Sequence, residues 1–212
     1  YTFTGWFEDE DFSGEPVIMI ESGSHGDVDL YAGYVPNPYE IKFNANGGEG
    51  KTATLSMTYD VEKELTKNGF TRSGYSFLGW SRTADGSVAY YDKSPVINLE
   101  SRADKVVNLY AVWSLDTYDI TYEVDKGTNA SGNPKTYTVL DSITLSEPSR
   151  IGYSFGGWLN EDGDKVEGVE KGTTGDLVFT AEWIPNENTP YVVEHYKRDI
   201  DKNTYTLSKR EI

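Results

Sequence analysis

Hydrophobic residues recur at every second position in one stretch of the chain, as in a half-buried β-strand. Val107, Leu109, Ala111 and Trp113 would share one face of such a strand. The same alternation recurs in two other stretches, at Leu177, Phe179, Ala181 and Trp183 and at Val28, Leu30, Ala32 and Tyr34. A small Ala among bulky residues predicts a position where an aromatic ring from another strand crosses the sheet.

A second alternating segment is expected to open each structural unit. Tyr39, Ile41 and Phe43 alternate with polar residues, and Asn46-Gly47-Gly48 follows as a tight turn with positive φ. Further along the chain, Asp125-Lys126-Gly127 stands where this turn would be. Extended runs over residues 52–65 and 135–145 are rich in Thr, Tyr and Val, as strands prefer. Residues 60–65 could instead form about a turn and a half of helix.

An aromatic motif ending in Trp completes the pattern. It occurs at Tyr1–Trp6, Gly74–Trp80 and Gly152–Trp158. A glycine precedes each of these tryptophans, which predicts a β-bulge or a close approach of two backbones. Trp80 and Trp158 are therefore the residues we expect at the centre of two hydrophobic cores.

Because these motifs recur in the same order, the chain is predicted to be a tandem array. Residues 1–38 would be the closing half of one repeat, 39–117 and 118–188 two full repeats, and 189–212 the start of a further repeat. The linkers are short and two contain Pro, so neighbouring repeats should be held close together. Each terminal half is expected to pack on a neighbouring repeat or to pair with the complementary half of another chain.

Three motifs together resemble a known family. They are Tyr-x-Ile-x-Phe-Asn-Ala-Asn-Gly-Gly at 39–48, Arg-x-Gly-Tyr-x-Phe-x-Gly-Trp at 72–80 and Leu-Tyr-Ala-x-Trp at 109–113. The combination resembles the Listeria–Bacteroides repeat, the B-repeat type of internalins, and residues 190–207 are similar to mucin-binding-type repeats. The resemblance implies a mostly β fold (α+β by class), with small β-grasp-like domains, little helix and a beads-on-a-string arrangement. It also implies a stalk or adhesion role in secreted or wall-anchored proteins of Gram-positive bacteria, some linked to virulence.

Composition narrows the chemistry that the chain can perform. It has 212 residues, no Cys, and 35 acidic against 19 basic residues, for a net charge of −16. Disulfides and thiolate chemistry are excluded, and the negative charge disfavours binding to nucleic acid. No apolar run approaches the roughly 18 residues of a membrane helix, so membrane insertion is not expected. No signal peptide opens the chain, and its first residues read as the middle of a strand, as in a fragment of a larger protein.

Candidate sites are few. His25 and His195 are far apart in sequence, and we predict no catalytic residue, no metal and no cofactor. The acidic segments 8–11 and 160–164 are read as polar hairpin tips, with a weak Ca²⁺ loop as the alternative. Tyr90 and Tyr91 are the candidate ligand-binding residues, because exposed rings can stack on sugars; a packing pair is the alternative reading.

The resulting hypothesis is a non-catalytic extracellular repeat region that acts as a stalk or spacer and as an adhesion module. The alternative is an accessory ligand-binding region of a larger secreted enzyme. The expected partners are a host surface protein or glycan and the neighbouring repeats of the same chain. The expected location is extracellular, either secreted or attached to the bacterial cell wall.

Overall fold

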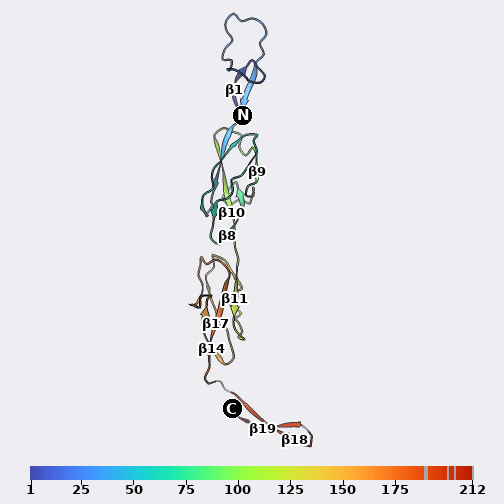
Figure 1. Ribbon diagram of the computed structural model, residues 1–212, viewed down its shortest axis with the longest axis vertical. Helices are drawn as coiled ribbons and strands as arrows, with labels where there is room; N and C mark the ends of the chain where they lie inside the picture. Colours follow the sequence, from blue (N-terminus) through green and yellow to red (C-terminus); the bar gives the residue numbers. More distant parts are fainter. Residues whose placement is uncertain (189–190, 200, 203, 212) are drawn as a thin grey trace. The chain divides into compact units, whose positions relative to one another are not determined.

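The computed structural model describes residues 1–188, 191–199, 201–202 and 204–211 (Figure 1). The chain divides into two compact units, Tyr1–Asp116 and Thr117–Ile212. The described residues contain strands and turns but no helix. The predicted mostly β class is therefore confirmed, and the small helical share allowed for in it is absent from these residues.

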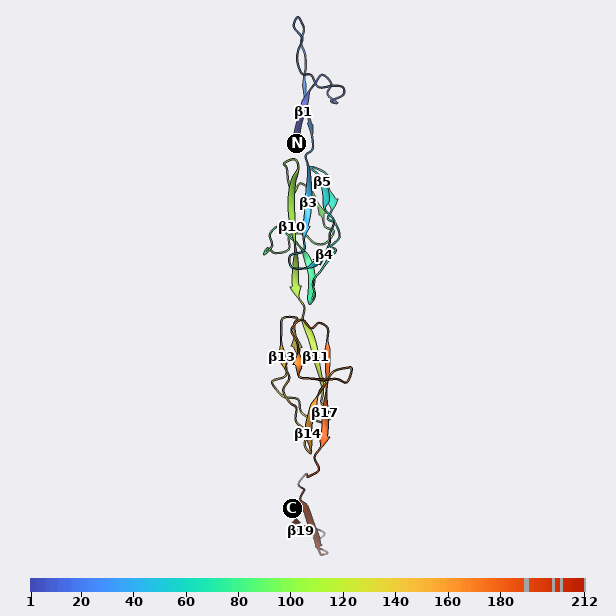
Figure 2. The same ribbon diagram turned by 90° about the vertical axis from the view of Figure 1, so that its left-hand side faces the viewer.

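Ten strands belong to the first unit. They are β1 (Thr2–Phe7), β2 (Tyr31–Val35), β3 (Pro38–Asn44), β4 (Glu49–Gly50), β5 (Leu55–Thr58), β6 (Lys63–Glu64), β7 (Phe70–Thr71), β8 (Tyr75–Ser81), β9 (Pro95–Val96) and β10 (Lys105–Leu115). The strands β1 and β2 form an antiparallel hairpin of their own. The main sheet has the order β5-β3-β10-β8, and Figure 2 shows β3 and β10 side by side at its centre.

Nine strands lie in the described residues of the second unit. They are β11 (Tyr118–Glu123), β12 (Thr136–Tyr137), β13 (Ile143–Thr144), β14 (Tyr153–Leu159), β15 (Lys165–Val166), β16 (Gly168–Val169), β17 (Leu177–Pro185), β18 (Val193–Asp199) and β19 (Thr204–Glu211). The main sheet has the order β12-β11-β17-β14-β15, and β18 and β19 form a separate two-stranded sheet.

The two main sheets share one topology. In each sheet the opening strand pairs in parallel with the closing strand, β3 with β10 and β11 with β17. The closing strand then pairs antiparallel with the strand that carries the aromatic motif, β8 or β14. Because a parallel pair needs a long crossover connection, the opening and closing strands lie at the two ends of each repeated sequence.

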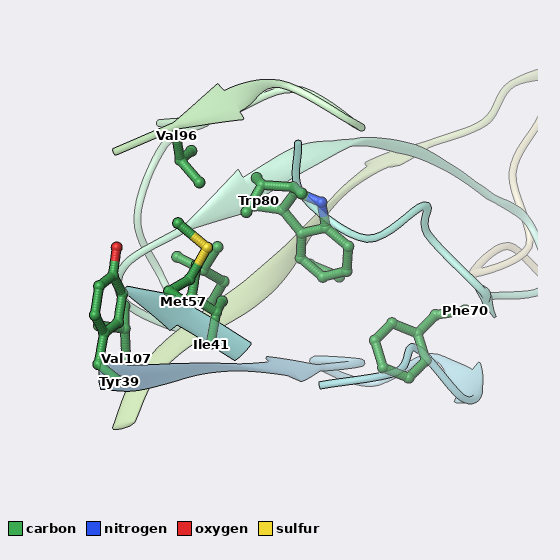
Figure 3. Close-up of a cluster of buried hydrophobic side chains, with 10 residues drawn as sticks. Tyr39, Ile41, Met57, Phe70, Trp80, Val96 and Val107 are labelled. Atoms are coloured by element: carbon green, nitrogen blue, oxygen red, sulfur yellow. The ribbon is translucent and has the colours of Figure 1, made fainter. Parts of the chain in front are cut away.

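Tryptophan rings fill the centre of both cores. Trp80 is 0% exposed and Trp158 is 2% exposed, so the predicted core positions are confirmed. Trp80 stands directly opposite Ala111 in the β8–β10 pair, and Trp158 opposite Ala181 in the β14–β17 pair. The predicted fit of a ring over the small Ala is thus confirmed. Figure 3 shows the Trp80 indole beside Phe70, with Ile41 and Met57 on the neighbouring strands.

The glycine before each Trp lies at a β-bulge. One extra residue interrupts the strand register next to Gly5, Gly79 and Gly157, and all three glycines have positive φ, at 147°, 152° and 134°. A bulge places two residues opposite one and turns the strand locally. The expectation of a bulge at this glycine is confirmed in all three copies.

Residues 60–65 form no helix, and the helical alternative for this segment was wrong. Asp60 has a φ of 64°, and its backbone N–H donates to the Asn98 side chain at 2.6 Å. Lys63 then enters strand β6 and pairs with Val96. These contacts come from residues more than 30 positions away, so local propensity does not decide the outcome.

The two buried indoles differ in their hydrogen bonding, which gives a first testable prediction. The Trp158 Nε1–H donates to the Ser146 carbonyl at 3.1 Å, whereas the buried Trp80 Nε1 has no hydrogen-bond partner among the described residues. Replacement by Phe removes a hydrogen bond only in the second unit, where the Ser146 carbonyl keeps Asn133 Nδ2 as a donor at 3.0 Å. In the first unit the same replacement removes a buried N–H that has no acceptor among the described residues. We therefore expect Trp158→Phe to lower the free energy of unfolding by about 1–2 kcal/mol more than Trp80→Phe does. Urea titrations of the two variants would measure the difference, and equal losses would contradict it.

Candidate functional site: the junction at Asn37

The linker between β2 and β3 is a buried joint rather than a free tether. Asn37 is only 6% exposed. Its side-chain oxygen accepts a hydrogen bond from the Thr2 hydroxyl at 2.7 Å, and its Nδ2 donates to the Ser101 carbonyl at 2.7 Å. Its own carbonyl accepts the Tyr59 N–H at 2.9 Å. One residue therefore connects the β1–β2 hairpin to two separate loops of the following sheet.

Tyr1 adds a second contact across the same junction. Its ring lies edge-on to Tyr59, with the ring centroids 5.7 Å apart, and its hydroxyl donates to Asp60 Oδ2 at 2.5 Å. The hydroxyl of Tyr1 and then the amide of Asn98 hold the pKa of Asp60 below its ordinary value. The same hydrogen bond raises the pKa of Tyr1, because a proton held by a carboxylate is harder to remove.

The loop that presents the Ser101 carbonyl is itself ordered by a carboxylate. Glu100 Oε1 accepts the backbone N–H groups of Ser101 and Arg102 at 2.9 and 3.0 Å. The same carboxylate accepts hydrogen bonds from Arg102 Nε at 3.0 Å and Arg102 Nη2 at 2.9 Å. These two bonds are the main reason that the pKa of Glu100 falls to about 2. This fixed loop gives Asn37 a partner in a defined position.

The position of Asn37 recurs after the closing strand of each copy. Asn37, Asp116 and Asn186 each stand three residues after the last aromatic residue of that strand, which is Tyr34, Trp113 or Trp183. Asp116 N–H donates to the Gly74 carbonyl at 3.0 Å, and Asn186 N–H to the Gly152 carbonyl at 2.9 Å. The Ser154 hydroxyl bonds the Asn186 side chain at 2.7 Å, as Thr2 bonds Asn37. Sequence reasoning missed this position, although an Asn or Asp at the same spacing in every copy was the available signal.

The candidate ligand residues Tyr90 and Tyr91 lie in different surroundings. Tyr90 is partly buried against the core, exchanges backbone hydrogen bonds with Trp80, and accepts a hydrogen bond from Arg82 Nε at 3.3 Å through its hydroxyl. Tyr91 is 71% exposed, and its backbone N–H donates to the Ser94 hydroxyl at 3.1 Å. No ring contact joins the two tyrosines in the described part of the chain. Their role in ligand binding stays a prediction.

The other candidate residues occupy loops and strand edges. His25 lies in an exposed turn, with Nδ1 3.5 Å from the Gly23 carbonyl, and His195 lies 3.5 Å from Glu211. In the tip at 160–164, the Asn160 side chain accepts the N–H groups of Asp162 and Asp164. Within the residues that the structure describes, no three His, Asp or Glu side chains gather as a metal site. Nor does this part of the chain hold a helix suited to crossing a membrane.

The junction makes a direct prediction for Asn37→Ala. The change removes two side-chain hydrogen bonds of the buried Asn37, to Thr2 and to the Ser101 carbonyl, so the β1–β2 hairpin should be held about 1–3 kcal/mol less tightly. Amide hydrogen exchange would show this as faster exchange at Thr2 to Phe7, with the core of residues 39–113 unchanged. Asn186→Ala is the matched control, since it lies in the other unit. Unchanged exchange in β1 would contradict the role assigned to Asn37.

Comparison with known proteins identifies the repeated sheet. The family model of the Listeria-Bacteroides repeat domain matches residues 1–33, 39–112 and 118–182. The chain is 26% identical over 200 residues to a protein of Evansella cellulosilytica named by inference as a Gly-rich membrane protein, covering 89% of this chain and 23% of the relative. A second protein of that organism, named by inference as a membrane protein, is 30% identical over 205 residues, covering 88% of this chain and 28% of the relative.

A more distant relative comes from another genus. Internalin H of Listeria monocytogenes is 28% identical over 92 residues, which are 42% of this chain and 16% of the internalin. No solved structure matches the chain. The chain thus spans about a quarter of the length of the two Evansella relatives. Since the family model matches most of its residues in three ordered copies, the chain belongs to the Listeria-Bacteroides repeat domain family.

Proposed function

We propose that this chain is a non-catalytic, extracellular repeat region of a bacterial surface or secreted protein, where it acts as a spacer and carries adhesion. The named relatives support a surface location, because two are described as membrane proteins and one as an internalin. Attachment to the cell wall and a host protein or glycan as partner are parts of the same proposal. In this reading residues 39–117 and 118–188 are the full repeats, 1–38 is a closing half, and 189–212 begins a further repeat.

The junction at Asn37 is the observation that supports a spacer. A spacer needs connections that limit the motion of one repeat against the next. The Asn37 side chain and carbonyl all have partners across a linker of two residues between β2 and β3. Pro36 and Pro38 restrict the same linker further, because the proline ring fixes φ. The acidic excess keeps such a chain soluble without giving it a catalytic group.

Small-angle scattering of chains with increasing numbers of repeats tests the spacer role. We expect the maximum dimension to grow by a constant increment with each added copy of residues 39–117. The Asn37→Ala variant should broaden the distance distribution without changing the fold of each repeat. A maximum dimension that stops growing as repeats are added would refute the spacer role.

Ligand binding by an accessory region remains the second candidate function, and Tyr91 favours it. Its ring is 71% exposed, and among the repeats of this sequence only this one has the Tyr-Tyr pair. An exposed aromatic ring suits the stacking of a sugar or a protein side chain. Tyr91→Ala should weaken binding to any glycan or host protein found by array screening at least about tenfold, equal to roughly 1.4 kcal/mol.

The same substitution should change stability by less than about 0.5 kcal/mol, because the side chain is largely in solvent. Leu78→Ala, another exposed residue of the same unit, is the control and should leave binding unchanged. If Tyr91→Ala and Leu78→Ala bind the screened ligand equally well, Tyr91 is not part of a binding surface.

A further inference from the structure

The β1–β2 hairpin repeats the closing half of the two full sheets, but nothing in the described chain covers it as they are covered. It has the same antiparallel pairing, the same bulge and the same Trp-over-Ala pair, Trp6 opposite Ala32. Yet Trp6 is 47% exposed, whereas Trp80 and Trp158 are buried. The pairing around the ring is the same in all three copies, so the difference in exposure comes from what covers the ring.

Opening-half residues cover the ring in the complete copies. Phe43 lies 4.6 Å from Trp80 and Phe70 lies 6.1 Å from it, and both precede the aromatic motif in the sequence. In the second unit Tyr122 of β11 lies 5.4 Å from Trp158. The only ring contact of Trp6 in the described chain is Phe3 at 5.7 Å, from its own strand.

The closing strand of the hairpin, β2, is also shorter at its N-terminal end than the closing strands β10 and β17 of the complete copies. In the complete copies, the residues that pair in parallel with the opening strand are Lys105–Tyr110 and Leu177–Thr180. The equivalent residues of the hairpin are 26–31 and 28–31, and of these only Tyr31 belongs to a strand. Strand β2 therefore begins where parallel pairing with an opening strand would end. Val28 and Leu30, predicted to lie on a buried strand face, lie outside any strand, and Val28 is exposed.

Charge indicates which kind of strand would fit. Residues 1–34 contain eight Asp and Glu and no Lys or Arg. Residues 39–73, an opening half from this chain, contain five acidic and five basic residues and are neutral. A neutral partner avoids repulsion by the acidic hairpin, and its alternating Tyr39, Ile41 and Phe43 supply the side chains that bury the ring in the complete copy.

We propose that the β1–β2 hairpin is a strand-acceptor surface whose occupant is the opening half of a Listeria-Bacteroides repeat. The opening strand pairs in parallel with residues 26–31, and its alternating hydrophobic side chains cover Trp6. Pairing of backbone groups supplies the affinity and the alternate side chains supply the specificity, as in other cases of strand addition. The inference does not depend on the spacer role, because it concerns only how this hairpin completes its sheet.

A fusion tests the proposal within the full chain. Residues 39–74 are duplicated in front of Tyr1, which restores the Gly-Tyr order of the aromatic motif and adds no Trp. The Trp6 indole N–H resonance is assigned by its loss in Trp6→Phe. We expect its hydrogen exchange to slow at least about tenfold in the fused chain, and residues 26–30 to gain protected amides. The Trp80 and Trp158 resonances should keep their positions, which shows that the remaining sheets are folded.

A matched control separates strand docking from the effect of added chain. The control fusion carries Ile41→Asp and Phe43→Asp in the added copy only, and it should leave Trp6 exchange as fast as in the unfused chain. Equal protection by both fusions, or by neither, would overturn the proposal. Sedimentation of the unfused chain supplies a further arm. Protection of Trp6 that rises with concentration, together with dimer formation, would overturn the assigned occupant in favour of a second copy.

Discussion

Replacing Trp80 with Ala is expected to lower the free energy of unfolding of residues 39–113 by about 3–5 kcal/mol. The indole is fully buried, stands opposite Ala111, and contacts the rings of Phe43, Phe70 and Phe77. An Ala at this position leaves a cavity between rings that a sheet cannot close by small movements. Because a small domain has about 5–15 kcal/mol of stability in total, the loss is a large part of it. Denaturant titration followed by near-ultraviolet circular dichroism measures the effect.

Trp6→Ala provides the matched comparison. The same residue type, bulge and opposing Ala occur there, but the ring is half exposed, so the loss should be below about 1 kcal/mol. A similar loss at both positions would show that the Trp stabilises its hairpin locally rather than through the core. An unchanged midpoint in Trp80→Ala would refute the core assignment itself.

Most of the fold prediction came from the alternation of hydrophobic and polar residues along the strands. Alternation places Val107, Leu109 and Ala111 on one face whatever the rest of the chain does, and all three are buried as expected. The bulge was equally accessible, because a Gly before each Trp is a local signal. Local signals of this kind repeat in every copy, so each copy supports the others.

Local sequence signals could not predict contacts between residues that are far apart in the sequence. The partners of Asn37 are Thr2 and Ser101, which lie 35 and 64 positions away, so nothing next to the linker indicates them. The helical alternative for residues 60–65 was wrong for the same reason, since Asn98 and Val96 hold that segment in another conformation. In the first copy the predicted face of Val28 and Leu30 does not form a strand, because alternation forms a strand only where a pairing partner exists. In this family, the residues that form a candidate site therefore depend on which opening and closing halves of the repeats pair with each other.

The bulge glycines give a second large effect that separates two sources of strain. At Gly79, with φ 152°, a Cβ would lie 2.6 Å from the Tyr90 carbonyl oxygen and 2.7 Å from Val88 Cγ1. At Gly157, with φ 134°, its nearest neighbour would be Lys165 Cδ at 3.4 Å, the middle of a flexible side chain. Both substitutions by Ala carry the backbone cost of about 1–2 kcal/mol, but only the first adds a clash with backbone, of about 1–3 kcal/mol.

We therefore expect Gly79→Ala to lower the free energy of unfolding of its unit by about 2–5 kcal/mol and Gly157→Ala by about 1–2 kcal/mol. Thermal unfolding of the two variants, each compared with the unchanged chain, would show the larger shift in the first unit. Equal losses would mean that the positive φ alone sets the requirement for Gly. A larger loss for Gly157→Ala would show that the segment at residues 88–90 moves away from the added Cβ at position 79. Such a movement is conceivable because backbone hydrogen bonds and packing at the edge of the core are what hold Tyr90 to Trp80. The comparison thus decides whether the Gly before the Trp is required by the bulge itself or by the segment at residues 88–90 that packs against it.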